Sequence, residues 1–345
     1  MFDCGEGTQH QLTKCKDVSM SKIEKIFITH LHGDHVFGLP GLMCTMSMMW
    51  QPPRVEPTSK CHQQEEAEEK PVRHAHFSRS SRYLEIYGPR PLAAYLRAVL
   101  SASESHFSFQ YRVNEIVHRK DESMEQVVLH QDEVEPIVHL MESNGTVSSL
   151  VELEEPVQVR AAALRHPIAS FGYVLYEPSS PGTLDVVACA KLKIPKGPLL
   201  AALKRGESVT FTDENGQLST ITPQQVVSDT VVGRTIVLLG DTSDSSNILP
   251  LTQDVHVLVH EATFDDAHQE LALPRGHSTA RMAGLFATKL NAKNLILTHF
   301  SARFAPTSVD HDPMVTVQQE AASVFSGSLL MAHDFLTVDL TKKKR

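Results

Sequence analysis

The sequence predicts an α/β fold with a functional site at the carboxyl ends of its strands. Short apolar runs with the composition of buried strands recur along the chain, at 23–29, 235–239, 256–259 and 294–297. The residues that follow these runs are acidic or histidine, namely His30, Asp241, His260 and His299. Open α/β sheets bind ligands at the carboxyl ends of their strands, so we expect these side chains to gather at one site.

Composition and charge narrow the class of protein. With 345 residues, of which 41% are hydrophobic and 21% charged, the chain can bury a large core. The net charge of −9 excludes a protein that coats nucleic acid through its overall charge, so any such contact needs a local basic patch. Five scattered cysteines, an odd number, predict reduced thiols in an intracellular protein of the cytosol and/or nucleus. No apolar run is long enough to predict a membrane span.

The first quarter of the chain combines a strand, a helix and an insertion. A glycine-rich turn at 4–8 normally follows a strand, but almost nothing precedes it, so we expect the first strand of the domain to be absent from this chain. After the strand at 23–29, residues 36–50 predict a helix whose methionines face the core or, less favoured, a binding surface. Residues 51–82 carry a charge run and little that is apolar, which predicts a disordered insertion.

The middle of the chain predicts further strands. Residues 84–88 form a short strand, and residues 91–100 a helix with proline in its first turn. Between this helix and residue 160 the apolar pattern alternates, for example at 107–111 and 157–161. That alternation predicts antiparallel strands of one sheet.

Residues 191–222 differ in character from the rest of the chain. Two proline-containing turns within 191–206 are followed by a predicted strand pair at 208–212 and 219–222. This segment is either a protruding arm or a plain surface loop with solvated basic side chains. Its basic residues are Lys191, Lys193, Lys196, Lys204 and Arg205. The last five residues, 341–345, form a basic tail.

Residues 30–35 (HLHGDH) predict a metal site. Three imidazoles and one carboxylate at the end of a buried strand are the ligand types that zinc prefers in open catalytic sites. The alternative is a polar turn with solvated histidines, but this pattern directly after an apolar strand is much rarer than an isolated histidine pair. His166 stands at a strand end before proline, an appropriate place for a further ligand.

The strand ends offer enough ligands for two metals. Two divalent ions about 3.5–4 Å apart can clamp a phosphoryl group, and such a pair calls for a bridging carboxylate. One ion takes His30, His32 and His166, the other takes Asp34, His35 and His299, and Asp241 bridges them. Asp34 is also a catalytic candidate, because it is placed to orient the attacking water and accept its proton.

Glu261 and His277 are not needed as metal ligands. A histidine that is oriented by a carboxylate can protonate a leaving alkoxide, so we predict that Glu261 orients His277 and that His277 is the general acid. The alternative is that His277, at the start of a predicted helix, only forms hydrogen bonds there.

Together these motifs resemble the metallo-β-lactamase superfamily and, more narrowly, the ribonuclease Z family in its short form. The motif at 30–35 specifies only the superfamily, whereas the pair 260–263 (HEAT) and 276–279 (GHST), with the segment 191–206, narrows it. Further stretches that carry the resemblance are 2–9, 37–41, 170–173, 240–242, 298–301 and 332–335.

The resemblance implies an αββα sandwich, two zinc ions, a homodimer, and cleavage of precursor tRNA that removes the 3′ trailer and leaves a 3′-hydroxyl on the tRNA. It also favours an arm over a plain loop at 191–222, because the matching segment of the family grips tRNA. The five basic residues of that segment are then the candidates for RNA binding. Family members begin with a strand that nothing here matches before Phe2.

Two other functions remain as alternatives. A hydrolase of the same fold that acts on a small ester, thioester or cyclic nucleotide would not need the arm. A non-catalytic RNA-binding or scaffolding derivative would bind RNA without cleaving it. Metal content, measured together with cleavage of precursor tRNA, distinguishes the three functions.

Overall fold

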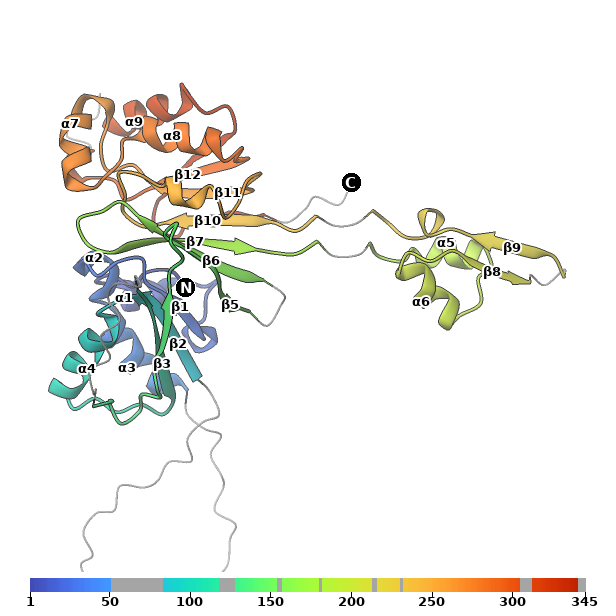
Figure 1. Cartoon of the computed structure of the whole chain (residues 1–345), viewed down its shortest axis with the longest axis horizontal. Coiled ribbons are helices and arrows are strands. Elements are labelled where there is room, and N and C mark those ends of the chain that lie inside the picture. The colour runs from blue at the N-terminus through green and yellow to red at the C-terminus, as the bar shows by residue number, and fades with distance from the viewer. Residues whose placement is uncertain are drawn as a thin grey trace, which may run out of the picture.

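Two β-sheets that face each other form the centre of the computed structural model (Figure 1). The structure describes residues 1–50, 83–117, 128–153, 157–179, 182–212, 216–229, 232–304 and 312–340. The predicted insertion at 51–82 and the predicted tail at 341–345 therefore lie outside the described residues. One sheet has the strand order β1-β2-β3-β4, and the other has the order β13-β12-β11-β10-β7-β6-β5.

The four-stranded sheet is parallel throughout. Its strands are β1 (Lys25–Phe27), β2 (Tyr83–Pro89), β3 (Gln110–Val117) and β4 (Ile137–Leu140). Helices α3 (Leu39–Met49) and α4 (Leu92–Ala102) cover its outer face, where Leu42 and Leu96 share a buried cluster with Ile86 of β2. The short helices α1 (Thr8–Lys14) and α2 (Gly33–Val36) complete this half.

The seven-stranded sheet is mixed. Its strands are β5 (Thr146–Glu152), β6 (Gln158–Leu164), β7 (Ser170–Tyr176), β10 (Thr235–Leu239), β11 (Val257–Glu261), β12 (Asn294–Thr298) and β13 (Ser328–Met331). Strands β10 to β13 are parallel, whereas β7 is antiparallel to both of its neighbours, β6 and β10.

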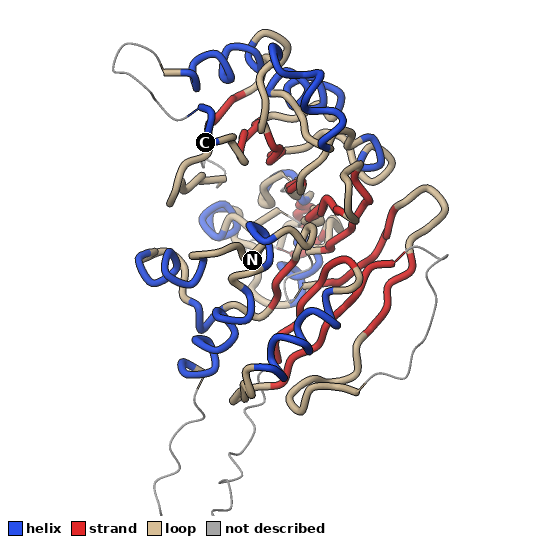
Figure 2. The backbone as a smooth tube through the Cα atoms, turned by 90° about the vertical axis from the view of Figure 1, so that its left-hand side faces the viewer, coloured by secondary structure: helices blue, strands red, loops and turns tan. Residues whose placement is uncertain are grey.

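Helices α8 (Ala280–Lys289) and α9 (Pro313–Ala322) cover the outer face of the seven-stranded sheet, and the four-residue α7 (Gln269–Ala272) lies beside them (Figures 1 and 2). Ala283 of α8 and Val317 of α9 share one buried cluster with Leu258 and Leu295 of the sheet. None of the helices in the described ranges is long and apolar enough to cross a membrane.

The inner faces of the two sheets meet in an aromatic core. Phe27 of β1 lies against Tyr87 of β2 and Tyr173 of β7, with ring centroids 4.9 and 5.3 Å apart. The Tyr173 hydroxyl donates a hydrogen bond of 2.7 Å to the Ile28 carbonyl and so ties one sheet to the other. The layers are helix, sheet, sheet and helix, which is the αββα arrangement that the resemblance implies.

The prediction that 107–111 and 157–161 are antiparallel strands of one sheet is wrong. Tyr111 lies on β3, which is parallel to β2 and β4 in the four-stranded sheet. Residues 157–161 enter β6, which is antiparallel to β5 and β7 in the other sheet. An alternating apolar pattern does not report strand direction. Because helix α4 connects β2 to β3, that connection is a crossover, which makes the pair parallel.

A small unit projects away from the seven-stranded sheet between β7 and β10 (Figure 1). It contains α5 (Val186–Lys191), α6 (Pro198–Lys204), β8 (Val209–Thr212) and β9 (Leu218–Ile221). Cys189, Leu203 and Phe211 belong to a buried cluster of its own. A bridge between Leu184 and Val227 closes the unit, so it is longer than the predicted 191–222. We call residues 184–227 the arm.

Because the arm has its own core, a cavity there should destabilise the arm alone. Leu203 is fully buried in that core, and we expect Leu203→Ala to cost about 2–5 kcal/mol of local stability. Hydrogen exchange should then quicken for amides of β8 and β9 and stay unchanged for β10 to β12. Equal acceleration in both regions would show that the arm and the sheets unfold as one unit.

Candidate metal centre

The strand directions bring the predicted site residues to one edge of the seven-stranded sheet. Strand β7 lies between β6 and β10 and is antiparallel to both. Strands β6, β10, β11 and β12 therefore all point the same way. Their carboxyl ends carry His166, Asp241, Glu261 and His299. The loop after β1 adds the HLHGDH residues from the facing sheet. The edge of one sheet and a loop of the other therefore supply a common site.

The first group of ligand atoms comprises His30, His32, His166 and Asp241. His30 Nε2 lies 3.1 Å from His32 Nδ1, and His166 Nε2 lies 3.3 Å from the same atom. The Asp241 Oδ2 atom is 3.7 Å from His30 Nε2. These atoms converge from three separate segments of the chain.

The second group comprises Asp34, His35 and His299. His299 Nε2 is 3.3 Å from both His35 Nε2 and Asp34 Oδ2. It is also 3.3 Å from Asp241 Oδ2, while Asp241 Oδ1 is 3.5 Å from His35 Nε2. Asp241 therefore faces both groups, as a bridging carboxylate must.

These spacings fit a metal ion. Zinc binds imidazole nitrogen at about 2.0–2.1 Å in a tetrahedron, which places neighbouring ligand atoms about 3.3 Å apart. The nitrogens of each group show this spacing. Without a metal ion between them, two ring nitrogens at this distance would face each other with no atom that both could bind. The donor set of imidazole and carboxylate is also the one zinc accepts.

The second ring nitrogen of four histidines is held by a hydrogen bond, which fixes ring orientation in metal sites. His166 Nδ1 donates to the Gly276 carbonyl at 2.9 Å. Gly276 has a φ of 76°, and a Cβ there would lie 2.3 Å from Pro167 Cδ, so only glycine allows this approach. The remaining pairs are His299 Nδ1 with Thr263 Oγ1 at 2.9 Å, His30 Nδ1 with Thr29 Oγ1 at 3.1 Å, and His35 Nδ1 with Asp3 Oδ2 at 2.8 Å.

Burial sets the protonation of the first group. Burial, together with the neighbouring imidazoles, lowers the pKa of His30 to about 2, and burial also lowers the pKa of His166. Both rings are therefore neutral at pH 7, the form that binds metal. In the second group, burial lowers the pKa of His35, but the hydrogen bond with Asp3 and the charges of Asp3, Asp241 and Asp34 together raise it.

Glu261 and His277 form a buried pair beside both groups. Glu261 is 1% exposed, and its Oε1 atom accepts hydrogen bonds from His277 Nδ1 at 3.0 Å and from the Thr242 amide at 2.8 Å. Burial lowers the pKa of His277, but the hydrogen bond with Glu261 and the charges of Glu261, Asp241 and Asp34 together raise it. The His277 ring stacks on His299 with centroids 5.7 Å apart. His277, Asp241 and His299 also form a third group of close ligand atoms.

All nine side chains that we predict as ligands or catalytic groups thus lie together or in direct contact, while the predicted RNA-binding residues lie elsewhere. The arm joins β10 at its amino end, whereas Asp241 follows the carboxyl end of the same strand. The arm, which Figure 1 shows, and the candidate metal centre are therefore at opposite ends of β10.

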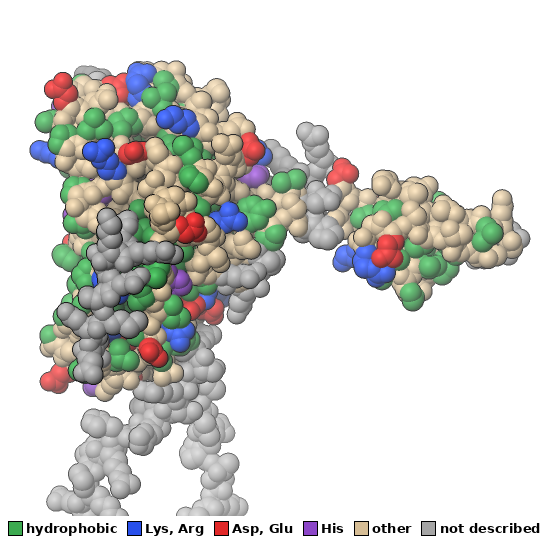
Figure 3. All heavy atoms as spheres, viewed as in Figure 1, with side chains coloured by type: hydrophobic (Ala, Val, Ile, Leu, Met, Phe, Trp, Pro, Cys, Tyr) green, Lys and Arg blue, Asp and Glu red, His purple; other side chains and the backbone are tan. Residues whose placement is uncertain are grey.

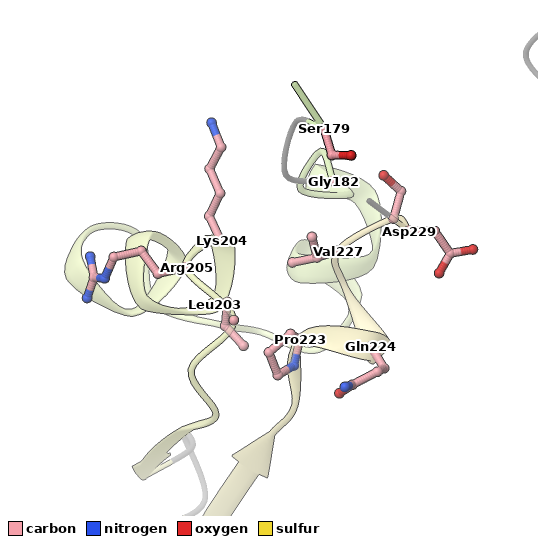
Figure 4. A pocket seen from close by; sticks show the side chains of 11 residues that line it. Ser179, Gly182, Leu203, Lys204, Arg205, Pro223, Gln224, Val227 and Asp229 are labelled. Atoms are coloured by element: carbon pink, nitrogen blue, oxygen red, sulfur yellow. The ribbon is translucent and has the colours of Figure 1, made fainter. Parts of the chain in front are cut away.

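The arm carries an open pocket of about 510 Å³. Lys204, Arg205 and Gln224 are among its lining residues (Figure 4). Arg205 is paired with Glu207, its Nε atom 2.9 Å from Oε1, and both side chains are exposed. Basic and acidic side chains consequently lie side by side on the arm (Figure 3), so its positive charge is partly compensated.

The sequence analysis did not predict three residues whose side chains contact the ring nitrogens of candidate ligand histidines, namely Asp3, Thr29 and Thr263. Asp3 and Thr263 lie within the stretches 2–9 and 260–263 that carry the family resemblance, and that is the only signal pointing to them. Thr29 directly precedes the first ligand histidine. Their contacts with ring nitrogens depend on the folded backbone, which no motif spacing encodes.

Comparison with known proteins gives relatives that cover the whole chain and one family model that covers only its first part. A family model described as "Anti-Pycsar protein Apyc1" matches residues 1–62. "Zinc phosphodiesterase ELAC protein 1" of Bos taurus is 35% identical, over 100% of this chain and 91% of that protein. "Ribonuclease Z" of Synechococcus sp. (strain CC9311) is 33% identical, over 100% of this chain and 90% of that protein.

Solved structures agree with these relatives. The crystal structure of human tRNase Z, short form (ELAC1), has a TM-score of 0.58 at 29% identity, and the match covers 99% of this chain and 88% of that one. The metallo-β-lactamase fold protein YhfI from Bacillus subtilis has a TM-score of 0.50 at 13% identity, covering 96% and 84%, and shows the fold alone.

Proposed function

Given that the chain belongs to the ribonuclease Z family, with its metallo-β-lactamase fold, we propose that it is a zinc-dependent endoribonuclease that removes 3′ trailers from precursor tRNA. The proposal includes two zinc ions per chain, a homodimer, and a place of action in the cytosol and/or nucleus. The observation that carries it is that Asp241 belongs to the first ligand group and also lies 3.3 Å from His299 of the second, with the Glu261–His277 pair directly beside them.

In the proposed reaction, water attacks the scissile phosphorus, the bond from phosphorus to the 3′-oxygen breaks, and the trailer keeps a 5′-phosphate. The metal ions, when bound, would supply positive charge to the phosphate oxygens and a water of lowered pKa. Asp34 has a 61% exposed side chain at the open side of the second group. It orients the attacking water and accepts its proton.

His277 completes the reaction by protonating the leaving group. Its Nδ1 atom faces Glu261, so Nε2 is the atom that offers a proton to the leaving 3′-oxygen of the tRNA. Since Glu261 raises the pKa of His277, a larger fraction of the ring is protonated at neutral pH. The product is a tRNA with a free 3′-hydroxyl.

We further propose that the arm binds RNA phosphates through Lys191, Lys193, Lys196, Lys204 and Arg205. Changing all five to glutamine should weaken precursor tRNA binding and flatten its salt dependence. Each lost phosphate contact should reduce the slope of log affinity against log salt by about 0.7–0.9. Filter binding or fluorescence anisotropy at several salt concentrations measures this slope.

Two controls make the arm experiment specific. The double change Lys289→Gln and Lys293→Gln removes one charge at the end of α8 and one just before β12, both outside the arm, and should leave the slope unchanged. Hydrolysis of a small phosphodiester should also be unchanged in the arm variant. A wild-type affinity that does not respond to salt would rule out phosphate binding by the arm, and would favour a hydrolase acting on small substrates.

Cleavage of precursor tRNA by the wild type and by His30→Ala tests the function itself. His30 has no exposed surface and its Nε2 atom points into the first ligand group, so the variant loses a ligand without losing surface charge. We expect cleavage by the wild type and none by the variant. Cleavage that persists in His30→Ala would indicate a contaminating nuclease or a different site.

A further inference from the structure

The most exposed aromatic ring in the described part of the chain stands beside the candidate metal centre. Phe37 is 57% exposed and directly follows helix α2, which carries Asp34 and His35 of the second ligand group. Asp34 and Phe37 are three positions apart in helical backbone, and side chains at that spacing lie on the same face of a helix. His35 and Val36 are buried and face the core. The Phe37 ring is therefore the neighbour of Asp34 at the open side of the centre.

The backbone and the ring of Phe37 are both held in place. The Phe37 amide donates to the Gly33 carbonyl at 2.9 Å, and the Gly38 amide donates to the Cys4 carbonyl at 2.9 Å. A Cβ on Gly33 would lie 2.6 Å from two carbons of the Phe37 ring, so the ring packs directly on the backbone of the metal-binding loop. The Tyr95 ring of α4 lies nearly parallel to it, at 23° and with centroids 6.2 Å apart. The ring is thus ordered before any ligand arrives, while more than half of the residue is exposed.

An ordered, open aromatic ring beside a centre that cleaves phosphodiesters suits a nucleobase. Proteins bind single-stranded RNA by stacking its bases on aromatic side chains. A ring that is already ordered loses little conformational freedom when a base stacks on it. Gly33, on which this ring packs, lies between the candidate ligands His32 and Asp34. A phosphate bound at the centre therefore brings an adjoining nucleotide next to Phe37.

The proposed reaction indicates which nucleotide this is. The attacking water and the leaving 3′-oxygen lie on opposite sides of the phosphorus in an in-line displacement. His277 protonates the leaving oxygen, so the last nucleotide of the tRNA lies on the side of His277. Phe37 lies on the side of Asp34, where the water attacks. The first trailer nucleotide is attached to the phosphorus through a different oxygen, so its base can turn toward Phe37.

We propose that Phe37 is a substrate-binding residue on which the base of the first trailer nucleotide stacks. This role rests on the proposed function, because only a substrate with a trailer has this nucleotide. Every base has a π face, so a stack of this kind holds the trailer without selecting its sequence.

Phe37→Ala removes the aromatic face. Loss of one stack between a base and an aromatic ring should lower kcat/KM for precursor tRNA about 5–150-fold. Phe37→Tyr keeps the ring and should behave as the wild type. Leu285→Ala is the control, because Leu285 is an exposed apolar residue on α8, in the outer helical layer, and its loss should leave kcat/KM unchanged.

Substrates that lack one base separate stacking from support of the metal-binding loop. With an abasic first trailer nucleotide, the wild type should lose the factor that Phe37→Ala loses on the normal substrate, and Phe37→Ala should lose nothing more. With an abasic last nucleotide of the tRNA, Phe37→Ala should still lose the full factor. A further loss on the substrate with the abasic trailer nucleotide would overturn the stack. So would a loss of bound zinc or a change of oligomeric state in Phe37→Ala, because the ring would then support the loop or a contact between copies.

A fluorescent base reads the stack without cleavage. The fluorescence of 2-aminopurine changes with stacking, so this base is placed at the first trailer nucleotide of a precursor tRNA. The scissile 3′-oxygen of this RNA is replaced by a methylene group, which prevents cleavage. We expect the zinc-loaded wild type to change the fluorescence on binding, and Phe37→Ala to change it less.

The outcomes separate the role of Phe37 from the proposed function. An equal fluorescence response in the wild type and Phe37→Ala would overturn the stack, even in a protein that cleaves precursor tRNA. A response that depends on Phe37, in a protein that leaves unmodified precursor tRNA uncut, would support the stack and count against the proposed function. A wild type that does not bind the RNA would contradict both.

Discussion

We expect Asp241→Asn to lower kcat/KM for precursor tRNA by more than about 10²–10³-fold, the cost of losing one strong stabilising contact to a transition state. The Asp241 side chain is 4% exposed; its Oδ1 atom faces His35 of the second group, and its Oδ2 atom faces His299 of that group and His30 of the first. Asparagine has one oxygen for two metals and presents hydrogens on the other side. Cleavage kinetics, with zinc content by atomic absorption, should therefore show a loss of activity and of bound metal.

Asp254→Asn is the matched control for this variant. Asp254 is exposed and lies just before the amino end of β11, whereas the ligand groups lie at the carboxyl ends of the strands. Its φ of 54° suits asparagine equally well. Its activity and zinc content should equal those of the wild type. Full activity and two bound zinc ions in Asp241→Asn would contradict the bridging role.

His277→Ala should lower kcat by about 10²–10⁴-fold, the usual contribution of a general acid, with a smaller effect on KM. The reason is that a 3′-alkoxide leaves poorly without a proton. A small diester with a nitrophenolate leaving group needs no such proton, so its hydrolysis should fall much less. Steady-state kinetics on both substrates measures the difference.

The exposed His10 on α1 provides the control, because His10→Ala removes an imidazole that contacts neither ligand group. An equal loss on both substrates in His277→Ala would show that His277 binds metal or supports the site rather than donating a proton. That result would favour the third ligand group of His277, Asp241 and His299 over the general-acid role.

The geometry of the candidate metal centre follows closely from the sequence because each candidate ligand stands where a strand ends. The apolar runs that precede the HLHGDH loop, Asp241 and His299 predict strands, and the structure has a strand at each of them. Even His166, predicted only from its place before a proline, lies 3.3 Å from His32. The side chains of the seven predicted ligands lie together. Their binding of metal stays a prediction.

The rest of the architecture depends on contacts that the sequence pattern does not carry. Strand β3 alternates like an antiparallel strand but is parallel, since α4 dictates its direction. Asp3 is 32 positions before His35, and backbone contacts such as the pairing of Phe2 with Phe27 bring them within hydrogen-bonding distance. The extent of the arm is likewise set by the Leu184–Val227 bridge and its own core, not by the basic residues that suggested it.

The most direct test of the account is to map the ends of the products. Wild-type protein, loaded with zinc and counted for bound metal, is incubated with a precursor tRNA that carries a labelled 3′ trailer. We predict two zinc ions per chain and a single cut that leaves a 3′-hydroxyl on the tRNA and a 5′-phosphate on the trailer. A tRNA that remains uncut by the zinc-loaded protein, or that is cut to leave a cyclic phosphate, would contradict it.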